Sequence, residues 1–125
     1  DEVYHAMPLL YMGNHLDRED TLRVLDWKKG LGIFPFEHVI DIFGDGSFLG
    51  ISTPGHSEGH LSYLLCTANG PILLTGDASH TAYGFHQGIE PGWVDDREAA
   101  EKSLQRIKEF ASQNPEVRII FGHKQ

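Results

Sequence analysis

The sequence has very little cysteine and few basic residues, and both shortages exclude classes of protein. Cys66 is the only cysteine among 125 residues, so no internal disulfide stabilises the chain. Its apolar neighbours Leu64 and Leu65 predict a buried thiol that serves packing, with a reactive thiolate as the alternative. Lysine and arginine together number 10 against 18 acidic residues, for a formal net charge of -8. This balance argues against a nucleic acid as partner.

The sequence also lacks a long apolar run. No stretch approaches the roughly 20 apolar residues that a membrane-spanning helix needs, so we expect a soluble, cytoplasmic protein with no membrane partner. With 125 residues there is room for one hydrophobic core, and 1–125 is expected to be a single domain. Residues 1–5 show neither an initiator methionine nor a signal-peptide pattern, which indicates that the chain starts inside a longer protein.

Apolar periodicity predicts an α/β fold. Four apolar runs of strand length are separated in pairs by glycine-containing turns, as in two β-hairpins, and these runs are 39–43, 48–52, 61–66 and 71–75. Helical spacing predicts helices over 17–29 and, more clearly, over 95–113, followed by a short strand at 117–121. The segment 76–93 has neither period and is expected to be an irregular surface segment.

These elements predict one mixed, mostly antiparallel sheet. Hairpin strands pair antiparallel, and the last strand can join the same sheet after a helix laid over one face. Helices would then lie on one face, and the opposite face would need a cover. A second copy of the chain could supply that cover, because a large exposed apolar face is rare in a monomer.

Three side chains of metal-ligand type each follow an apolar strand. His56 lies on the proline- and glycine-containing turn at 53–60, Asp77 follows the run at 71–75, and His123 ends the last strand. Imidazole and carboxylate together suit zinc and related divalent cations. A histidine facing water or an aspartate that caps a turn is the simpler alternative for each residue alone. Their repeated placement at strand exits favours a shared metal site.

The order of the motifs around these residues resembles the metallo-β-lactamase superfamily of hydrolases. The similar motifs are Thr-Pro-Gly-His-Ser-Glu-Gly-His at 53–60, Leu-Thr-Gly-Asp-Ala at 74–78 and Phe-Gly-His at 121–123. The resemblance extends over about 39–123. It implies a four-layer αβ/βα sandwich, in which two similar halves pack sheet to sheet and hold a dinuclear metal site at one edge.

The resemblance also implies roles for the three residues. His56 would bind one metal ion, Asp77 would bridge both ions, and His123 would bind the other. The metal would be zinc, with iron or manganese as alternatives. The first motif of the superfamily, His-x-His-x-Asp-His, is absent from this sequence. We therefore expect 1–125 to be the C-terminal portion of such a hydrolase without its N-terminal half, binding metal weakly and inactive by itself.

Within the superfamily, the segment at 76–81 is similar to the N-acyl homoserine lactonase branch. A tyrosine of that branch contacts the substrate carbonyl, and His80 stands at the corresponding position here. Asp77 and His80 are therefore the candidate catalytic residues. The His80 imidazole could donate a hydrogen bond to the carbonyl or act as general acid to the leaving group, and a surface histidine is the alternative. His60 is expected to support the His56 turn.

The implied function is metal-dependent hydrolysis of a small-molecule lactone or ester by hydroxide generated between the two ions. Thiolester, sulfate or phosphodiester hydrolysis within the same superfamily is an alternative. A non-catalytic half-fold that binds a partner or a second copy is another. Tyr83, Phe85 and Trp93 either line an apolar pocket for an acyl tail or pin the segment that carries them.

Overall fold

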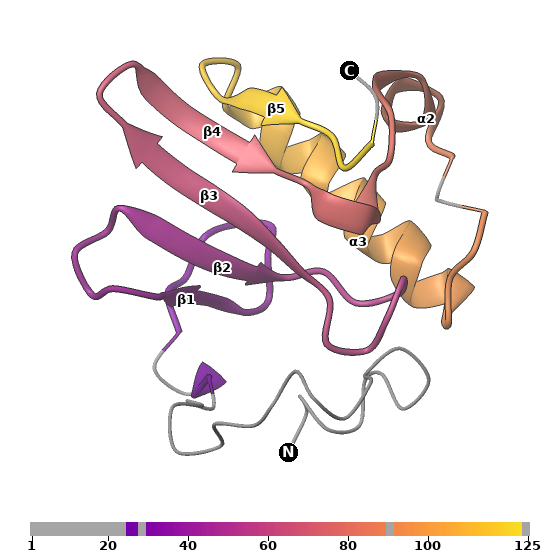
Figure 1. Ribbon diagram of the computed structural model, residues 1–125, viewed down its shortest axis with the longest axis horizontal. Helices are drawn as coiled ribbons and strands as arrows, with labels where there is room; N and C mark the ends of the chain where they lie inside the picture. Colours follow the sequence, from indigo (N-terminus) through magenta and orange to yellow (C-terminus); the bar gives the residue numbers. More distant parts are fainter. Residues whose placement is uncertain (1–24, 28–29, 90–91, 124–125) are drawn as a thin grey trace, which may run out of the picture.

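A five-stranded sheet forms the centre of the computed structural model (Figure 1). The structure describes residues 25–27, 30–89 and 92–123. The strands lie in sequence order across the sheet and are β1 (Val39–Asp41), β2 (Phe48–Ser52), β3 (Leu61–Thr67), β4 (Gly70–Leu74) and β5 (Arg118–Ile120). Strands β1 to β4 pair antiparallel, and β5 pairs parallel to β4. Both predicted hairpins and the final strand are confirmed.

Three helical elements connect β4 to β5, namely η3 (Gly76–Ala78), α2 (Ala82–Gln87) and α3 (Arg97–Gln113). The carboxylate of Asp96 accepts a hydrogen bond from Ala99 N and caps the start of α3. Asn114 ends the helix, and the proline that follows cannot continue it. Helix α3 lies behind the sheet and runs along it (Figure 1), as expected for 95–113.

The hydrophobic core lies between the sheet and α3. Leu49, Leu64 and Leu73 are neighbours across β2, β3 and β4, so their side chains share one face of the sheet, and all three are buried. Helix α3 adds Leu104 and Ile107 to the same cluster. Each such side chain stabilises the fold by roughly 1.5–3 kcal/mol when it is fully buried. The sheet and α3 therefore form two layers of one hydrophobic core.

The opposite face of the sheet has no described helix over it (Figure 1). Tyr63, Leu74 and Leu65 point to this face and are only half-buried. Phe48 stacks on Tyr63, and the exposed Phe43 stacks on Phe48. The prediction of helices on one face is thus confirmed for the part of the chain that the structure describes.

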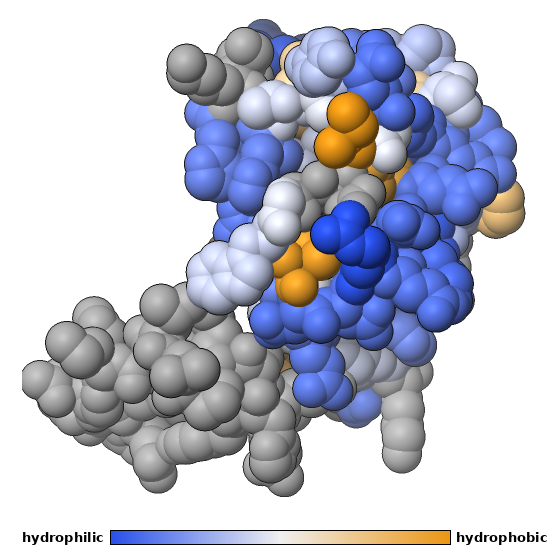
Figure 2. Space-filling model, turned by 90° about the vertical axis from the view of Figure 1, so that its right-hand side faces the viewer, coloured by the Kyte–Doolittle hydropathy of each residue, from blue (hydrophilic) through white to orange (hydrophobic). Residues whose placement is uncertain are grey.

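The side of the molecule that carries α2 faces the viewer in Figure 2. It is mostly hydrophilic, with a few small and separate hydrophobic patches. Such scattered apolar groups are normal on a surface that faces water. Among the described residues, no helix is long and apolar enough to cross a membrane.

Two sequence predictions are wrong, and one falls mostly outside the described residues. The segment 76–93, expected to be irregular, contains α2, whose six residues are too few to reveal a helical period. Cys66, expected to be buried, is exposed because it lies next to the turn at the end of β3, where the sheet reaches solvent. The helix expected over 17–29 falls largely on residues that the structure does not describe.

Gly55 lets the turn after β2 approach the backbone of α3 closely, because it has no Cβ. Its φ is +137°, and a Cβ there would overlap the backbone of Ala100. We expect Gly55→Ala to lower the free energy of unfolding by roughly 1–3 kcal/mol, because strain and overlap add. Urea denaturation measures the change. Gly32→Ala is the matched control, since a Cβ at Gly32 meets nothing within 4 Å; equal stability losses in the two variants would contradict the assignment.

Candidate metal centre

The predicted ligands meet at one end of the sheet. Because β2 and β4 both run antiparallel to β3, and β5 runs parallel to β4, the three strands end at the same edge. His56 lies on the turn that follows β2, Asp77 lies in η3 directly after β4, and His123 follows β5. Residues separated by up to 67 positions are therefore brought together by strand direction alone.

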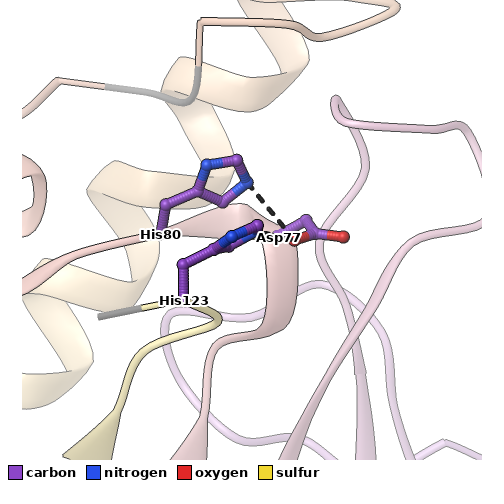
Figure 3. A group of neighbouring side chains, drawn as sticks. All are labelled: Asp77, His80 and His123. Atoms are coloured by element: carbon purple, nitrogen blue, oxygen red, sulfur yellow. Dashed lines mark hydrogen bonds and ion pairs between the residues drawn. The ribbon is translucent and has the colours of Figure 1, made fainter. Parts of the chain in front are cut away.

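The rings of His80 and His123 both point toward the carboxylate of Asp77 (Figure 3). Its Oδ1 is 3.1 Å from Nε2 of His123 and 3.2 Å from Nε2 of His80. Its Oδ2 is 3.4 Å from Nε2 of His56. Burial raises the pKa of Asp77, but the hydrogen bond from His123 and the charges of His56 and His80 outweigh burial and lower it overall. Asp77 is thus an ionised carboxylate with imidazoles on both sides.

The ring of His56 is oriented by a backbone carbonyl. Its Nδ1 lies 3.2 Å from the carbonyl oxygen of Trp93. A carbonyl oxygen only accepts hydrogen bonds, so Nδ1 carries the hydrogen, and in a neutral ring Nε2 then has a lone pair. That lone pair faces Oδ2 of Asp77, which also offers only lone pairs. The two atoms repel one another unless a proton or a cation lies between them.

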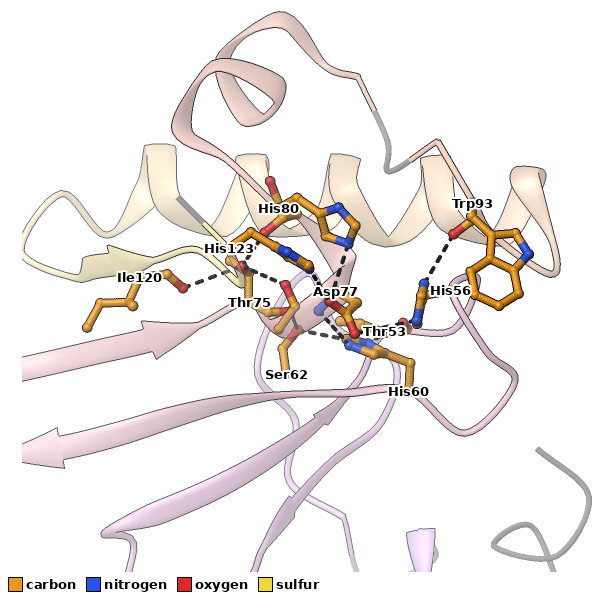
Figure 4. A network of polar contacts seen from close by, with 12 residues as sticks. Thr53, His56, His60, Ser62, Thr75, Asp77, His80, Trp93, Ile120 and His123 are labelled. Atoms are coloured by element: carbon orange, nitrogen blue, oxygen red, sulfur yellow. Dashed lines mark hydrogen bonds and ion pairs between the residues drawn. The ribbon is translucent and has the colours of Figure 1, made fainter. Parts of the chain in front are cut away.

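His60 has both ring nitrogens occupied within the protein (Figure 4). Its Nε2 accepts a hydrogen bond from Asp77 N at 2.9 Å. Its Nδ1 lies 3.1 Å from the carbonyl oxygen of Thr53 and 2.9 Å from the Thr53 hydroxyl. Burial lowers the pKa of His60, in keeping with a neutral ring. His60 therefore positions the backbone of Asp77 and, through Thr53, contacts the start of the turn that carries His56.

Sequence reasoning missed the buried hydroxyls that extend this network (Figure 4). The hydroxyls of Thr53 and Ser62 lie 2.9 Å apart, and Ser62 donates to the carbonyl oxygen of Thr75. The Thr75 hydroxyl donates to the carbonyl oxygen of Ser79 at 2.8 Å. All four residues are buried. The only sequence signal was a polar residue at the end of each apolar strand, and these residues hold the ends of β2, β3 and β4 together.

His123 is positioned by its backbone. Gly122 N donates to the carbonyl oxygen of Ser79 at 3.1 Å, and His123 N donates to that of His80 at 3.0 Å. A Cβ on Gly122 would overlap the carbonyl group of Gly76, so glycine is required for this close approach. The segment after β5 is thereby fixed against η3.

His80 lies beside His123, with 3.9 Å between the ring centroids. Burial and the charge of His123 lower the pKa of His80, although Asp77 opposes them. Its Nε2 is buried and has no hydrogen-bond partner among the described residues. The 3.2 Å contact with Asp77 Oδ1 is thus a close approach without the direction of a hydrogen bond.

The nearby aromatic residues divide into two kinds. Phe85 is buried and packs against Phe121, so it fixes α2 to the core. The side chains of Tyr83 and Trp93 are about 70% exposed, at 71% and 70%. Of the two alternatives left open by the sequence, pinning the segment applies to Phe85. The ring of Trp93 lies edge-on to that of His56, and both Tyr83 and Trp93 keep most of their surface exposed.

The remaining described histidines lie apart from the cluster around Asp77. His38 contacts Trp27, and His86 contacts Phe85. Within the described part of the chain, the group of His, Cys, Asp and Glu side chains close enough to share one metal ion consists of Asp77, His80 and His123. His56 joins the cluster from the other side of Asp77. His5 and His15 lie outside the described residues.

The lowered pKa of His60 predicts how stability depends on pH. An unfolded histidine takes up a proton near pH 6.5, whereas burial resists protonation in the folded state. The contribution of His60 to the free energy of unfolding should therefore be complete above pH 6.5, and the free energy of unfolding should decrease as the pH falls below that value. His60→Gln should flatten this slope and, with the hydrogen bonds disturbed, cost about 1–3 kcal/mol at neutral pH.

Urea denaturation across this pH range tests the prediction. His86→Gln is the control, because His86 is exposed and lies outside the network. Because the pKa of His80 is also lowered, the free energy of unfolding of the His60 variant should still depend on pH, but less steeply. A slope equal to that of the unmodified chain in His60→Gln would contradict the assignment.

Comparison with known proteins agrees with this geometry. The sequence matches the metallo-beta-lactamase superfamily over residues 2–123. It is 33% identical over 84 residues to the N-acyl homoserine lactonase AttM of Agrobacterium fabrum, covering 66% of this chain and 32% of that protein. It is 42% identical over 72 residues to the N-acyl homoserine lactonase of Bacillus cereus, covering 57% of this chain and 28% of that protein.

The structure is similar to a solved N-acyl homoserine lactone hydrolase with the product N-hexanoyl-L-homoserine bound at its catalytic metal centre. The TM-score is 0.62 with 34% sequence identity, over 69% of this chain and 33% of that one. The chain thus spans about a third of the length of the relatives that it matches. Family match, identity and fold agree, and the chain belongs to the metallo-beta-lactamase superfamily.

Proposed function

We propose that this chain is the C-terminal part of a metal-dependent hydrolase that acts on small-molecule lactones or related esters. The observation that carries the proposal is the position of Asp77, whose two oxygens face different imidazoles. Oδ1 faces His123 and His80, and Oδ2 faces His56. A carboxylate between two sets of nitrogen ligands is the arrangement that bridges a pair of cations. The similarity to N-acyl homoserine lactonases favours a lactone as the substrate.

The residues fit divalent cations. Imidazole nitrogens and a carboxylate are ligands that zinc takes, and iron or manganese accept the same set. Nε2 of His80 is buried without a hydrogen-bond partner among the described residues, and Nε2 of His56 directs a lone pair at Oδ2. His56 and His123 would hold one ion each, with Asp77 between them. When bound, the pair of ions would polarise the substrate carbonyl and acidify a water molecule.

Residues of the chain itself would orient the metal ligands and supply a proton to the substrate. The carbonyl of Trp93 holds the His56 ring, and His60 holds the backbone of Asp77 through its N–H. His80 adjoins the same carboxylate and would donate a hydrogen bond or a proton to the oxygen that leaves the carbonyl. The exposed rings of Tyr83 and Trp93 would contact the acyl part of the substrate.

The activity belongs to the whole protein in this proposal. Because the chain spans about a third of its relatives, other segments would supply the remaining ligands, and the 125-residue chain alone would be inactive. A cytoplasmic location stays a prediction.

Substrate assays on the full-length protein test the proposal. We expect hydrolysis of an N-acyl homoserine lactone to exceed that of a thiolester, a sulfate ester and a phosphodiester. Asp77→Asn should lower the lactonase rate by about 100-fold or more, because ligand loss disturbs both ions. His86→Gln should retain the rate. A preference for another ester class would contradict the substrate, and a fully active Asp77→Asn variant would contradict the metal mechanism.

The sheet face opposite α3, over which the structure describes no helix, favours a second candidate, a non-catalytic module that pairs with a second copy. Phe43, Phe48 and Tyr63 form an aromatic stack on that face, and Phe43 is 72% exposed. Such a face is stable in water when another apolar surface covers it.

Light scattering of the 125-residue chain at micromolar concentration tests this candidate. If two copies pair through this face, the chain will have the mass of a dimer, and Phe48→Lys will weaken the dimer by at least about tenfold, because a charge would be buried. Tyr83→Lys, which changes an exposed residue of α2, should leave the dimer intact. A monomeric unmodified chain would reject the candidate.

A further inference from the structure

Asp77, His80 and His123 form a group that differs from the set of His56, Asp77 and His123 that the superfamily resemblance implies. Each offers one ligand atom, and no two of these atoms are more than 4.8 Å apart. Both imidazoles approach the same carboxylate oxygen, Oδ1, with their Nε2 atoms at 3.1 and 3.2 Å (Figure 3). His56 approaches the other oxygen and does not belong to this group.

The two imidazoles differ in what they do at Oδ1. His123 makes a hydrogen bond to it. Nε2 of His80 is equally close but has no hydrogen-bond partner among the described residues, and no solvent reaches it. A buried nitrogen left without a partner costs free energy and calls for an explanation. A cation held between this nitrogen, His123 and Oδ1 would supply the missing partner.

The position of His80 is fixed by the backbone and does not depend on its ring. His80 O accepts from His123 N, and Ser79 O accepts from Gly122 N. Thr81, the next residue, caps α2 through its hydroxyl. These contacts hold the ring beside that of His123 before any ion binds, and preorganised ligands of this kind favour binding.

We propose that Asp77, His80 and His123 bind one divalent cation of the zinc type in this chain, with His80 as a protein ligand. The ligand atoms would be Nε2 of both imidazoles and Oδ1 of Asp77. In a tetrahedral site with bonds near 2.0–2.1 Å, ligand atoms lie roughly 3.3 Å apart. The separations of 3.1 and 3.2 Å come close to this spacing, and His123, with a side chain 58% exposed, has room to adjust.

The inference deepens the proposed function, on which it rests for the choice of metal, but it requires neither hydrolysis nor His56. It also has a consequence for the reaction. A nitrogen that binds a cation has no hydrogen to donate, so His80 could not donate through Nε2 while the ion is bound. Only its Nδ1–H would remain for a hydrogen bond to the substrate or to water.

Zinc titration of the 125-residue chain by calorimetry, with nitrogen NMR of the histidine rings, tests the inference. We expect one Zn²⁺ per chain and zinc-dependent shifts of Nε2 in His80 and His123, with His60 unchanged. His80→Gln should weaken zinc binding by about 10–100-fold, as should Asp77→Asn. His86→Gln, which changes an exposed histidine outside the site, should bind zinc as the unmodified chain does.

The NMR measurement needs no substitution, so it decides the question even if a variant fails to fold. Zinc binding with the His80 nitrogens unshifted would overturn the inference, as would unchanged affinity in a folded His80→Gln variant. Either result would leave the proposed function standing, since His56, Asp77 and His123 remain available. Zinc binding through His80 without lactone hydrolysis by the full-length protein would contradict the proposed function alone.

Discussion

The position of the Asp77 carboxylate depends on the hydrogen bond that His60 accepts from its backbone N–H. That bond is the last step in a buried network that begins at Thr53 and ties the ends of β2, β3 and β4 together. With the backbone held in this way, the carboxylate points outward between the imidazoles. The network therefore separates two tasks, since His60 positions Asp77 and the other histidines face its oxygens.

The balance of charge around Asp77 follows from the same arrangement. A partly buried carboxylate is costly unless positive charge or hydrogen-bond donors surround it. His56, His80 and His123 supply these interactions and keep the pKa of Asp77 low despite burial. Burial in turn lowers the pKa of His80, which keeps its ring neutral near pH 7. Carboxylate oxygens and imidazole nitrogens are electron-pair donors, and a cation can bind such a set in place of the protons that they share.

Much of the fold and the convergence of the site could be predicted from the sequence. The pair Asn69 and Gly70 between apolar runs indicates a hairpin, and β3 and β4 form it. The polar residues at strand exits indicated a shared edge. What could not be predicted depends on packing over long range. Neither the exposure of Cys66 nor the lack of a hydrogen-bond partner for Nε2 of His80 among the described residues leaves a local pattern, because each depends on where distant segments stop.

Anomalous diffraction from crystals of the full-length protein grown with zinc tests the central claim most directly. The account predicts zinc density on both sides of Asp77, about 2.0–2.2 Å from its oxygens, with His56 on one side and His123 on the other. Zinc density elsewhere on the protein, with the Asp77 carboxylate bound only to water and imidazole hydrogens, would contradict it.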